Sequence, residues 1–455
     1  MRKILTKVML LGLGALAVVP MVSCGKEVIY VADKRGSTPT PTQGGGDQTG
    51  TTPTQTTTVA PAPVDDNPGD GTTYNLTVWC AQEDVEMITT MLSAYEEKYN
   101  KNTYNWKVEK QGEDIVSSTV VRDVSAAADV FSFANDQIGT LMQNQALAPI
   151  SSAYTAQIDE QIDVAKLAAT FNNAYYAIPY SYENCFLYYN KSLISDVSTM
   201  EGILSKSIPG VTHNLGIDMA DSYYTTMFLY TAGLTIFGDQ GTNPNDVDFT
   251  SATAYPKSVK ACKYIASLNS KSKLNSIAKA DQYAALANKN VAAMISGPHM
   301  ISLFKAALGD DFGVAMLPKI RFEGESTDTQ LVSFSGVKMY GVTQKAATVR
   351  DQKTTNEAMK VAAYLANKEN QQIRLEEREF CPTDSDLFEE AVDSGIKTVE
   401  VVVNQSEYSR LKPGIIQMSN YWDNMKGFLQ GVYKLSYAET SWKTELQKIE
   451  EKLKS

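Results

Sequence analysis

The sequence contains few of the residues that build metal sites and few signatures of catalysis. Its 455 residues include only two histidines, His213 and His299, and five cysteines without any CxxC pair. Zinc and haem sites need such ligands at closer spacing, so we expect no metal and no cofactor. No GxSxG or Walker motif occurs, and one GxGxxA run lies in an apolar segment at residues 12–17. The sequence therefore supports neither a serine hydrolase nor an NTPase, and we predict no catalytic residue.

The chain has no strongly apolar run that is long enough to span a membrane. Residues 8–22 form its longest apolar stretch, which would reach roughly 22 Å as a helix, against about 30 Å of hydrocarbon. Three basic residues precede this run, and Ser23 and Cys24 follow it. This order of charged, apolar and small residues predicts a signal peptide at residues 1–23.

Residues 21–24, MVSC, resemble the lipobox of bacterial lipoproteins. The resemblance implies that Cys24 receives a diacylglycerol, becomes the mature N-terminus and carries palmitate-type chains that anchor the protein in the cell membrane. We expect it on the extracellular face, or in the periplasm of a Gram-negative source. An ordinary cleaved signal with a chance cysteine is the alternative. Residues 24–73, rich in Thr, Pro and Gly, are predicted as a disordered tether.

The formal net charge is -11, and removal of the basic signal peptide would make it more negative. An acidic protein is a poor partner for nucleic acid, so we expect no nucleic-acid binding. The four cysteines that follow Cys24 are scattered along the chain, and we interpret them as buried thiols without predicting a disulfide.

From residue 74 the pattern becomes that of an α/β domain. Three short strands are predicted: an apolar one at 76–79, one with alternating apolar residues at 104–108, and a third at 130–133. Apolar residues at helical spacing predict helices between them, at 85–100 and 116–124. Such a βαβαβ unit forms a parallel sheet. Ligands bind beyond the carboxyl ends of strands in these sheets, here at residues 79–83 and 133–136.

Several ordered segments resemble the family 1 extracellular solute-binding proteins, which include the maltose-binding proteins. They are NLTVWC, ADVFSFANDQIG, YAIPY followed by LYYNKSL, AAMISGPHM, FGVAMLPKI and MSNYW. The resemblance implies an α/β, two-lobed periplasmic-binding-protein fold of type II, with a hinge and an interlobe cleft. It places residues 74–184 and 334–388 in the N-terminal lobe and residues 185–333 and 389–455 in the C-terminal lobe.

The resemblance also implies which residues contact the ligand. Carried over position by position, the ligand-binding residues are Glu83, Phe133, Asp136, Glu183, Asp221, Tyr223, His299 and Trp422. Aromatic rings pack on the C–H faces of a sugar and carboxylates accept its hydroxyl protons, so this mixture suits a carbohydrate. Alternatives remain open, because Tyr224 would replace Tyr223 and Gln82 would join Glu83 if the loops shift in alignment. Phe133 is also compatible with a core position.

The chain departs from the maltose-binding pattern at two of these positions and at two neighbouring ones, Asp84, which the resemblance also places at the site, and Gln137. Asp84 and Gln137 stand where that pattern has a lysine and an arginine, and Phe133 and His299 stand where it has tryptophans. We therefore expect fewer cationic donors in the cleft and a neutral oligosaccharide as ligand, with maltooligosaccharides as the leading candidates. Related families bind spermidine, iron or glycerol phosphate, so a non-sugar solute such as a polyamine is an alternative.

The function implied is that of the substrate-binding lipoprotein of an ABC importer. Such a protein captures a sugar by hinge closure and delivers it to the transmembrane subunits of a permease, without catalysis. We expect a monomer. A secreted carbohydrate-active enzyme, which needs a pair of carboxylates across the cleft, and a lectin-like surface protein are the alternatives.

Overall fold

The computed structural model describes residues 69–454. The predicted signal peptide, Cys24 and most of the predicted tether lie outside these residues. No helix within residues 69–454 combines the length and the apolar character needed to cross a bilayer.

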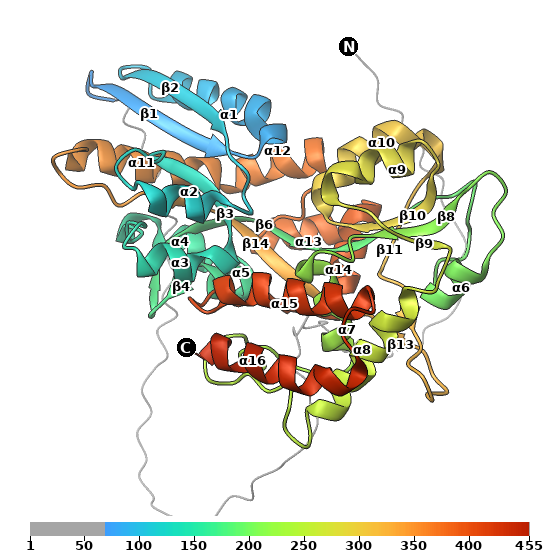
Figure 1. Ribbon diagram of the computed structural model, residues 1–455. Coiled ribbons are helices and arrows are strands. Elements are labelled where there is room, and N and C mark those ends of the chain that lie inside the picture. Colours follow the sequence, from blue (N-terminus) through green and yellow to red (C-terminus); the bar gives the residue numbers. More distant parts are fainter. Residues whose placement is uncertain (1–68, 455) are drawn as a thin grey trace, which may run out of the picture. The chain divides into compact units, whose positions relative to one another are not determined.

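The larger of two main sheets contains six strands in mixed orientation (Figure 1). Its order is β15-β14-β3-β1-β2, and β6 also pairs with β14. β1 is parallel to both β2 and β3, whereas β14 is antiparallel to β3 and β6. The bounds are β1 (Thr73–Cys80), β2 (Thr103–Lys110), β3 (Val130–Ala134), β6 (Ile178–Asn184), β14 (Ser333–Val342) and β15 (Ser409–Leu411).

The predicted βαβαβ unit is confirmed in this sheet. β1, β2 and β3 cover the three predicted strands, and the connecting helices are α1 (Val85–Lys98) and α2 (Val116–Arg122). The apolar residues at helical spacing in α1 are buried, among them Ile88, Leu92 and Tyr95. The carboxyl ends of the three parallel strands therefore meet at one edge of the sheet.

The second main sheet has five strands, in the order β11-β7-β10-β8-β9. Its bounds are β7 (Phe186–Asn190), β8 (His213–Ile217), β9 (Leu274–Ser276), β10 (Val291–Ser296) and β11 (Phe312–Ala315). Two small hairpins are formed by β4 (Thr170–Phe171) with β5 (Ala174–Tyr175) and by β12 (Lys319–Ile320) with β13 (Thr329–Gln330). Buried apolar side chains form two clusters, one of which includes residues of both main sheets, such as Val78 of β1 and Tyr188 of β7. The residue limits of the two lobes stay a prediction.

Helices surround both sheets. The remaining α-helices are α3 (Ile138–Gln143), α4 (Thr155–Asp159), α5 (Asp163–Ala169), α6 (Met200–Ser205), α7 (Ser222–Thr231), α8 (Tyr255–Leu268), α9 (Gln282–Ala287), α10 (Ile301–Leu308), α11 (Gln352–Leu365), α12 (Lys368–Arg378), α13 (Ser385–Asp393), α14 (Lys397–Ser406), α15 (Met418–Tyr433) and α16 (Trp442–Lys454). Short 3₁₀ helices include η1 (Gln82–Asp84), η2 (Asn135–Gln137), η4 (Lys279–Asp281) and η5 (Pro298–Met300).

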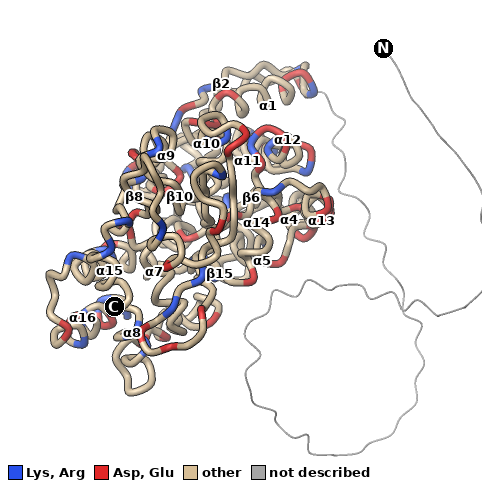
Figure 2. The backbone as a smooth tube through the Cα atoms, turned by 90° about the vertical axis from the view of Figure 1, so that its right-hand side faces the viewer, with Lys and Arg blue, Asp and Glu red and all other residues tan. Residues whose placement is uncertain are grey.

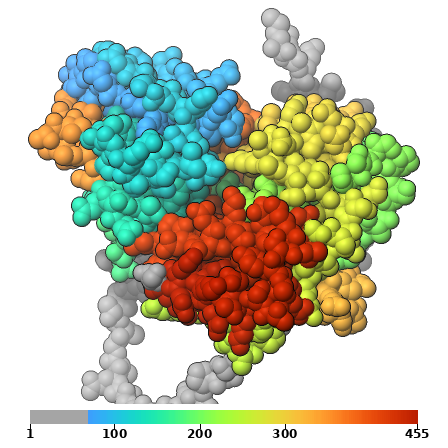
Figure 3. Space-filling model, in the orientation of Figure 1, coloured from blue at the N-terminus to red at the C-terminus, as the bar shows by residue number. Residues whose placement is uncertain are grey.

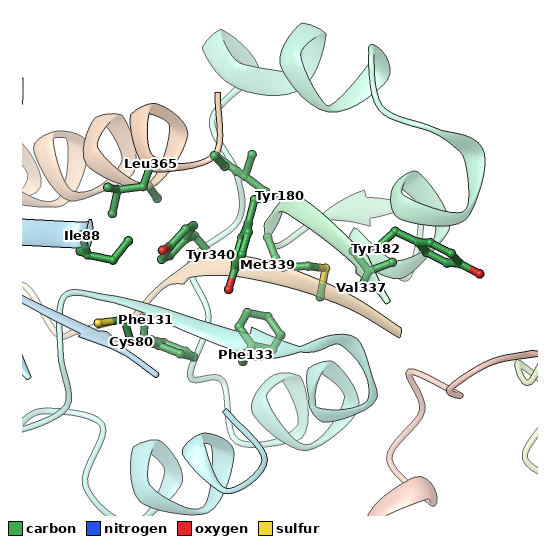
Figure 4. Close-up of a cluster of buried hydrophobic side chains, with 14 of the residues drawn as sticks. Cys80, Ile88, Phe131, Phe133, Tyr180, Tyr182, Val337, Met339, Tyr340 and Leu365 are labelled. Atoms are coloured by element: carbon green, nitrogen blue, oxygen red, sulfur yellow. The ribbon is translucent and has the colours of Figure 1, made fainter. Parts of the chain in front are cut away.

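β14 is the strand on which the larger sheet is organised. It pairs with β3, β6 and β15, and all ten of its residues are buried. Figure 4 shows its Val337, Met339 and Tyr340 among side chains from β3 and β6. The four cysteines that the structure describes are all buried and free, as interpreted from the sequence.

The chain between β15 and α15 packs tightly against the η2–α3 segment. Asn135 joins the two, because its side-chain amide donates to the Lys412 carbonyl at 2.7 Å while its oxygen accepts from the Val337 amide at 3.1 Å. Gly139 in α3 lies against the backbone at Ile415, where an added Cβ would come within 2.4 Å of the carbonyl carbon. Only a glycine fits this contact without movement of the main chain.

Two glycine substitutions test this packing. We expect Gly139→Ala to lower the free energy of unfolding by about 1 to 3 kcal/mol, because the methyl group must displace backbone. Gly427→Ala is the matched control: no atom lies within 4 Å of its added Cβ, which projects from the middle of α15. Because alanine favours the helical conformation more than glycine does, the free energy of unfolding of this variant should rise by about 0.5 to 1 kcal/mol. Denaturant unfolding of both variants measures the difference, and equal stabilities would contradict the packing described.

Candidate ligand-binding site

A cavity of about 970 Å³ lies between the two main sheets. One wall consists of residues at or beyond the ends of β1, β2, β3, β6 and β15, together with one residue inside β14. The opposite wall comes from the segments that follow β8, β9 and β10 and from α15. Figure 3 shows the surface hollowed where the cyan, yellow and red parts of the chain meet.

Most of the ligand-binding residues predicted from the sequence line this cavity. The structure brings together Glu83, Asp136, Glu183, Asp221, Tyr223, His299 and Trp422. Gln82 and Tyr224, the two alternatives, line it as well. Residues separated by more than 300 positions in the sequence thus share one space.

Phe133 is the exception among the predicted residues. Its ring is fully buried, stands 5.5 Å from the ring of Phe131, and does not line the cavity. In Figure 4 it points toward Met339, its partner across the β3–β14 ladder. Successive side chains of a strand point to opposite faces, and here the face of Phe133 belongs to the core. Asp84, also implied by the resemblance, forms a 2.6 Å ion pair with Arg378 instead of facing the cavity.

The floor of the cavity contains a buried ion pair that the sequence did not predict. Lys338, in the middle of β14, places its ammonium 2.7 Å from a carboxylate oxygen of Glu113. The hydroxyls of Tyr180 and Ser132 both donate to the other Glu113 oxygen at 2.8 Å. Burial alone would raise the pKa of Glu113, but Lys338 and these donors lower it to about 2.

A second buried lysine stands on the same floor. The ammonium of Lys412, directly after β15, lies 3.0 Å from Asp136. Burial alone would lower the pKa of Lys412, but the carboxylates of Asp136 and Glu183 raise it. Gly336, which is paired with Glu183 across the β14–β6 ladder, leaves room for this side chain, because an added Cβ would lie 2.7 Å from Lys412 Cε.

Aromatic rings form part of the opposite wall. Trp422 on α15 is half-buried and its ring packs edge-on against Phe334 at 5.4 Å. Tyr223 on α7 stacks at 6.0 Å on Phe334, and the ammonium of Lys412 lies 5.8 Å from the Tyr223 ring centre. Asp221 caps α7, since its carboxylate accepts from the Tyr223 amide at 2.8 Å, and burial raises the pKa of Asp221.

His299 is held neutral at the cavity edge. Burial, together with the positive charges of Lys279 and Lys338, lowers its pKa to about 3. Its Nε2 is buried and has no hydrogen-bond partner among the described residues. A neutral imidazole is both a donor and an acceptor, so the hydrogen-bonding capacity of this atom is unused within the described residues.

Three of the floor residues were missed from the sequence, although signals for two of them existed. Glu113 follows β2, so the rule that was applied to the ends of β1 and β3 also applies there. Lys338 is a charged residue inside the otherwise uncharged strand SFSGVKMYGV, and a charge there requires a buried partner. Lys412 gave no such signal. The cavity nevertheless contains buried cations, because these two lysines supply them from elements other than those considered in the sequence.

Solved structures of binding proteins share this fold. The maltodextrin-binding protein MalE1 from L. casei BL23, without ligand, superposes with a TM-score of 0.71 at 24% identity, over 84% of this chain and 99% of that one. MalX from Streptococcus pneumoniae, in complex with maltopentaose, superposes with a TM-score of 0.68 at 20% identity, over 83% of this chain and 99% of that one. The two-lobed type II periplasmic-binding fold is thereby confirmed.

Sequence comparison gives the same result. The galactooligosaccharide-binding protein of Bacillus subtilis (strain 168) is 26% identical over 381 residues, which cover 78% of this chain and 84% of that protein. The family described as bacterial extracellular solute-binding proteins matches residues 90–395, more than half of the chain. The resemblance read from the sequence motifs is confirmed, and the chain belongs to the bacterial extracellular solute-binding protein family.

Proposed function

We propose that this protein is the sugar-binding receptor of an ABC importer and that its ligand is an oligosaccharide. The observation that carries the proposal is the composition of the cavity: the rings of Tyr223 and Trp422 form part of one wall, and the carboxylates of Asp136 and Glu183 form part of the other. Rings pack on the apolar faces of a sugar and carboxylates accept from its hydroxyls. The names of the galactooligosaccharide-binding relative and of the maltodextrin-binding structures agree with this class of ligand.

The proposed mechanism is closure of the two lobes over the ligand. The ring-bearing wall comes from the second sheet and its helices, and the carboxylate-bearing wall from the larger sheet. A sugar that contacts both walls favours the closed state by contacts that the open state lacks. The closed form would then deliver the sugar to the transmembrane subunits of a permease, with the protein acting as a monomer.

A carbohydrate-active enzyme is the alternative with a related ligand. It would need one carboxylate to act as an acid and another as a base or nucleophile. Glu113 and Asp136 each form an ion pair with a lysine, and the pKa of Glu113 is about 2. Such carboxylates stay ionised at neutral pH, so they suit a role as hydrogen-bond acceptors better than a role in proton transfer. We therefore favour binding without catalysis.

A ligand panel tests the proposal. Galactotriose, maltotriose, spermidine and glycerol phosphate should be added separately to the mature protein, and melting temperature and binding heat measured. A ligand that binds only the folded protein raises its melting temperature by mass action, so we expect a rise with at least one of the two trisaccharides. The same samples should release no reducing sugar. Tight binding of spermidine or glycerol phosphate without any saccharide binding would overturn the sugar function.

Trp422 and Trp442 make a matched pair for the role of the ring wall. Trp422 lines the cavity, whereas Trp442 is buried at the start of α16 and does not. Trp422→Ala should weaken the trisaccharide that binds the wild type by about thirty- to a thousandfold, the effect of losing a buried contact of about 2 to 4 kcal/mol. Trp442→Ala should instead cost roughly 3 to 5 kcal/mol of stability and leave the affinity of the folded fraction unchanged. The reverse pattern would remove Trp422 from the site.

We further propose that the mature protein begins at a diacylated Cys24 and is held at the outer face of the cell membrane. The support is the residue order of the N-terminal segment, with its MVSC sequence, and the family's extracellular character. Cys24→Ala should release the protein into the medium or leave it unprocessed, as seen by fractionation and intact mass. An unmodified mature N-terminus at another residue would contradict the anchor.

A further inference from the structure

Five charged side chains of alternating sign lie in a row on the cavity floor: Glu113, Lys338, Glu183, Lys412 and Asp136. The first pair is 2.7 Å apart, the second 3.9 Å and the last 3.0 Å. Glu183 and Lys412 both border the space beside Gly336. A Cβ added to this glycine would lie 3.4 Å from the carboxylate of Glu183 and 3.1 Å from the ammonium of Lys412. Each of the five side chains is at most 16% exposed, so their charges are weakly screened by water.

Glu113, at one end of the row, has its hydrogen bonds satisfied by the protein, whereas Glu183 in the middle does not. At the other end, Asp136 Oδ1 has the ion pair with Lys412 but no hydrogen bond of good geometry among the described residues. Glu113 accepts hydrogen bonds from Tyr180, Ser132 and Lys338. Glu183 is different: within residues 69–454 its carboxylate has no donor within hydrogen-bond distance, since Lys338 is 3.9 Å away. Both lysines that flank Glu183 also line the cavity, as Glu183 does.

We infer that Lys338 and Lys412 are ligand-contacting residues which, with Glu183 between them, select a neighbouring pair of uncharged hydroxyl groups. This inference deepens the proposed sugar-binding function and rests on it. A hydroxyl donates one hydrogen bond and accepts others. A hydroxyl at Glu183 donates to the carboxylate and accepts from one lysine, and its neighbour on the sugar ring accepts from the other lysine.

Charged ligand groups fit this row less well. The carboxylate of a uronate and the dianion of a phosphate monoester have no proton to donate to Glu183 at neutral pH, and either group would meet three carboxylates and only two ammonium groups. An ammonium group donates to Glu183 but accepts nothing from the lysines, which repel it. The two buried lysines therefore do not indicate a receptor for acidic sugars, because their charges are already balanced by neighbouring carboxylates.

The other charged groups of the cavity do not change this balance. Asp218 and Asp221 face the ligand space from the second sheet, and Asp221 is occupied in capping α7. Lys279 pairs at 3.9 Å with Asp114 from the opposite wall, and both are largely exposed. His299 is neutral because its pKa lies near 3. An anionic group on the ligand thus meets no unpaired buried cation on the described part of either wall.

The experiment compares three charge forms of one kind of ligand. Galactotriose and maltotriose serve as neutral probes, their C6-oxidised uronate forms as anionic probes, and their 6-amino-6-deoxy forms as cationic probes. Affinities are measured by calorimetry at pH 7. For the wild type we expect the neutral forms to bind at least about tenfold more tightly than either charged form.

Two variants change the row while keeping the fold. Glu183→Gln replaces the carboxylate with an amide that also donates, so the neutral sugar should lose on the order of tenfold to a hundredfold in affinity while the uronate form loses less. Gly336→Ala places a methyl group against the flexible end of Lys412 and should displace its ammonium from Asp136 and from the ligand, with a loss of similar size. Lys353→Met, which removes an exposed lysine paired with Asp70 away from the cavity, is the control and should bind as the wild type does.

The outcomes separate the inference from the function on which it rests. Equal binding of neutral and charged forms by the wild type, or variants that weaken all probes by the same factor, would overturn the role of the row while leaving a sugar receptor. Tighter binding of the uronate form would show that the lysines form an anion site. Failure of every sugar to bind the folded wild type would overturn the sugar function and this inference together. Melting temperatures of all variants identify any loss that is due to unfolding.

Discussion

Strand β14 runs through the protein with all ten residues buried, and one of them is a lysine. A buried ammonium without a partner costs several kcal/mol, so Lys338 constrains the elements around it. Glu113, after β2, supplies the counter-charge, and Tyr180 and Ser132 from β6 and β3 hold that carboxylate. One ion pair thus ties four strands of the larger sheet together at the edge where the cavity opens.

The same constraint shapes the ligand site. Lys412 reaches the floor because Asn135 holds its backbone and Gly336 leaves space for its side chain. The charge network has its acceptors and donors fixed before a ligand arrives, which reduces the ordering cost of binding. Figure 2 shows acidic and basic residues distributed along the described part of the backbone. The buried pairs fix the geometry of their side chains, whereas exposed pairs contribute little.

The wall opposite the network contains aromatic rings beside its polar groups. Trp422 and Tyr223 each pack on Phe334 of β14, so apolar packing contributes to their positions. A ligand held between the walls therefore meets the charge network on one side and ring surfaces on the other. Such a division suits a molecule with hydroxyl edges and C–H faces, which is the chemistry of a sugar ring.

The sequence by itself determined the parallel βαβαβ unit and the family. Alternation, helical spacing and ordered motifs are local patterns along the chain, so they can be recognised without knowledge of tertiary contacts. It also indicated seven of the residues that line the cavity, since strand ends and family motifs carry them. Only the tertiary structure decided that the ring of Phe133 belongs to the core, because the face of a strand that becomes buried depends on what packs against it. The row from Glu113 to Asp136 likewise required the fold, since its members come from five separate segments and their charges balance only when those segments meet.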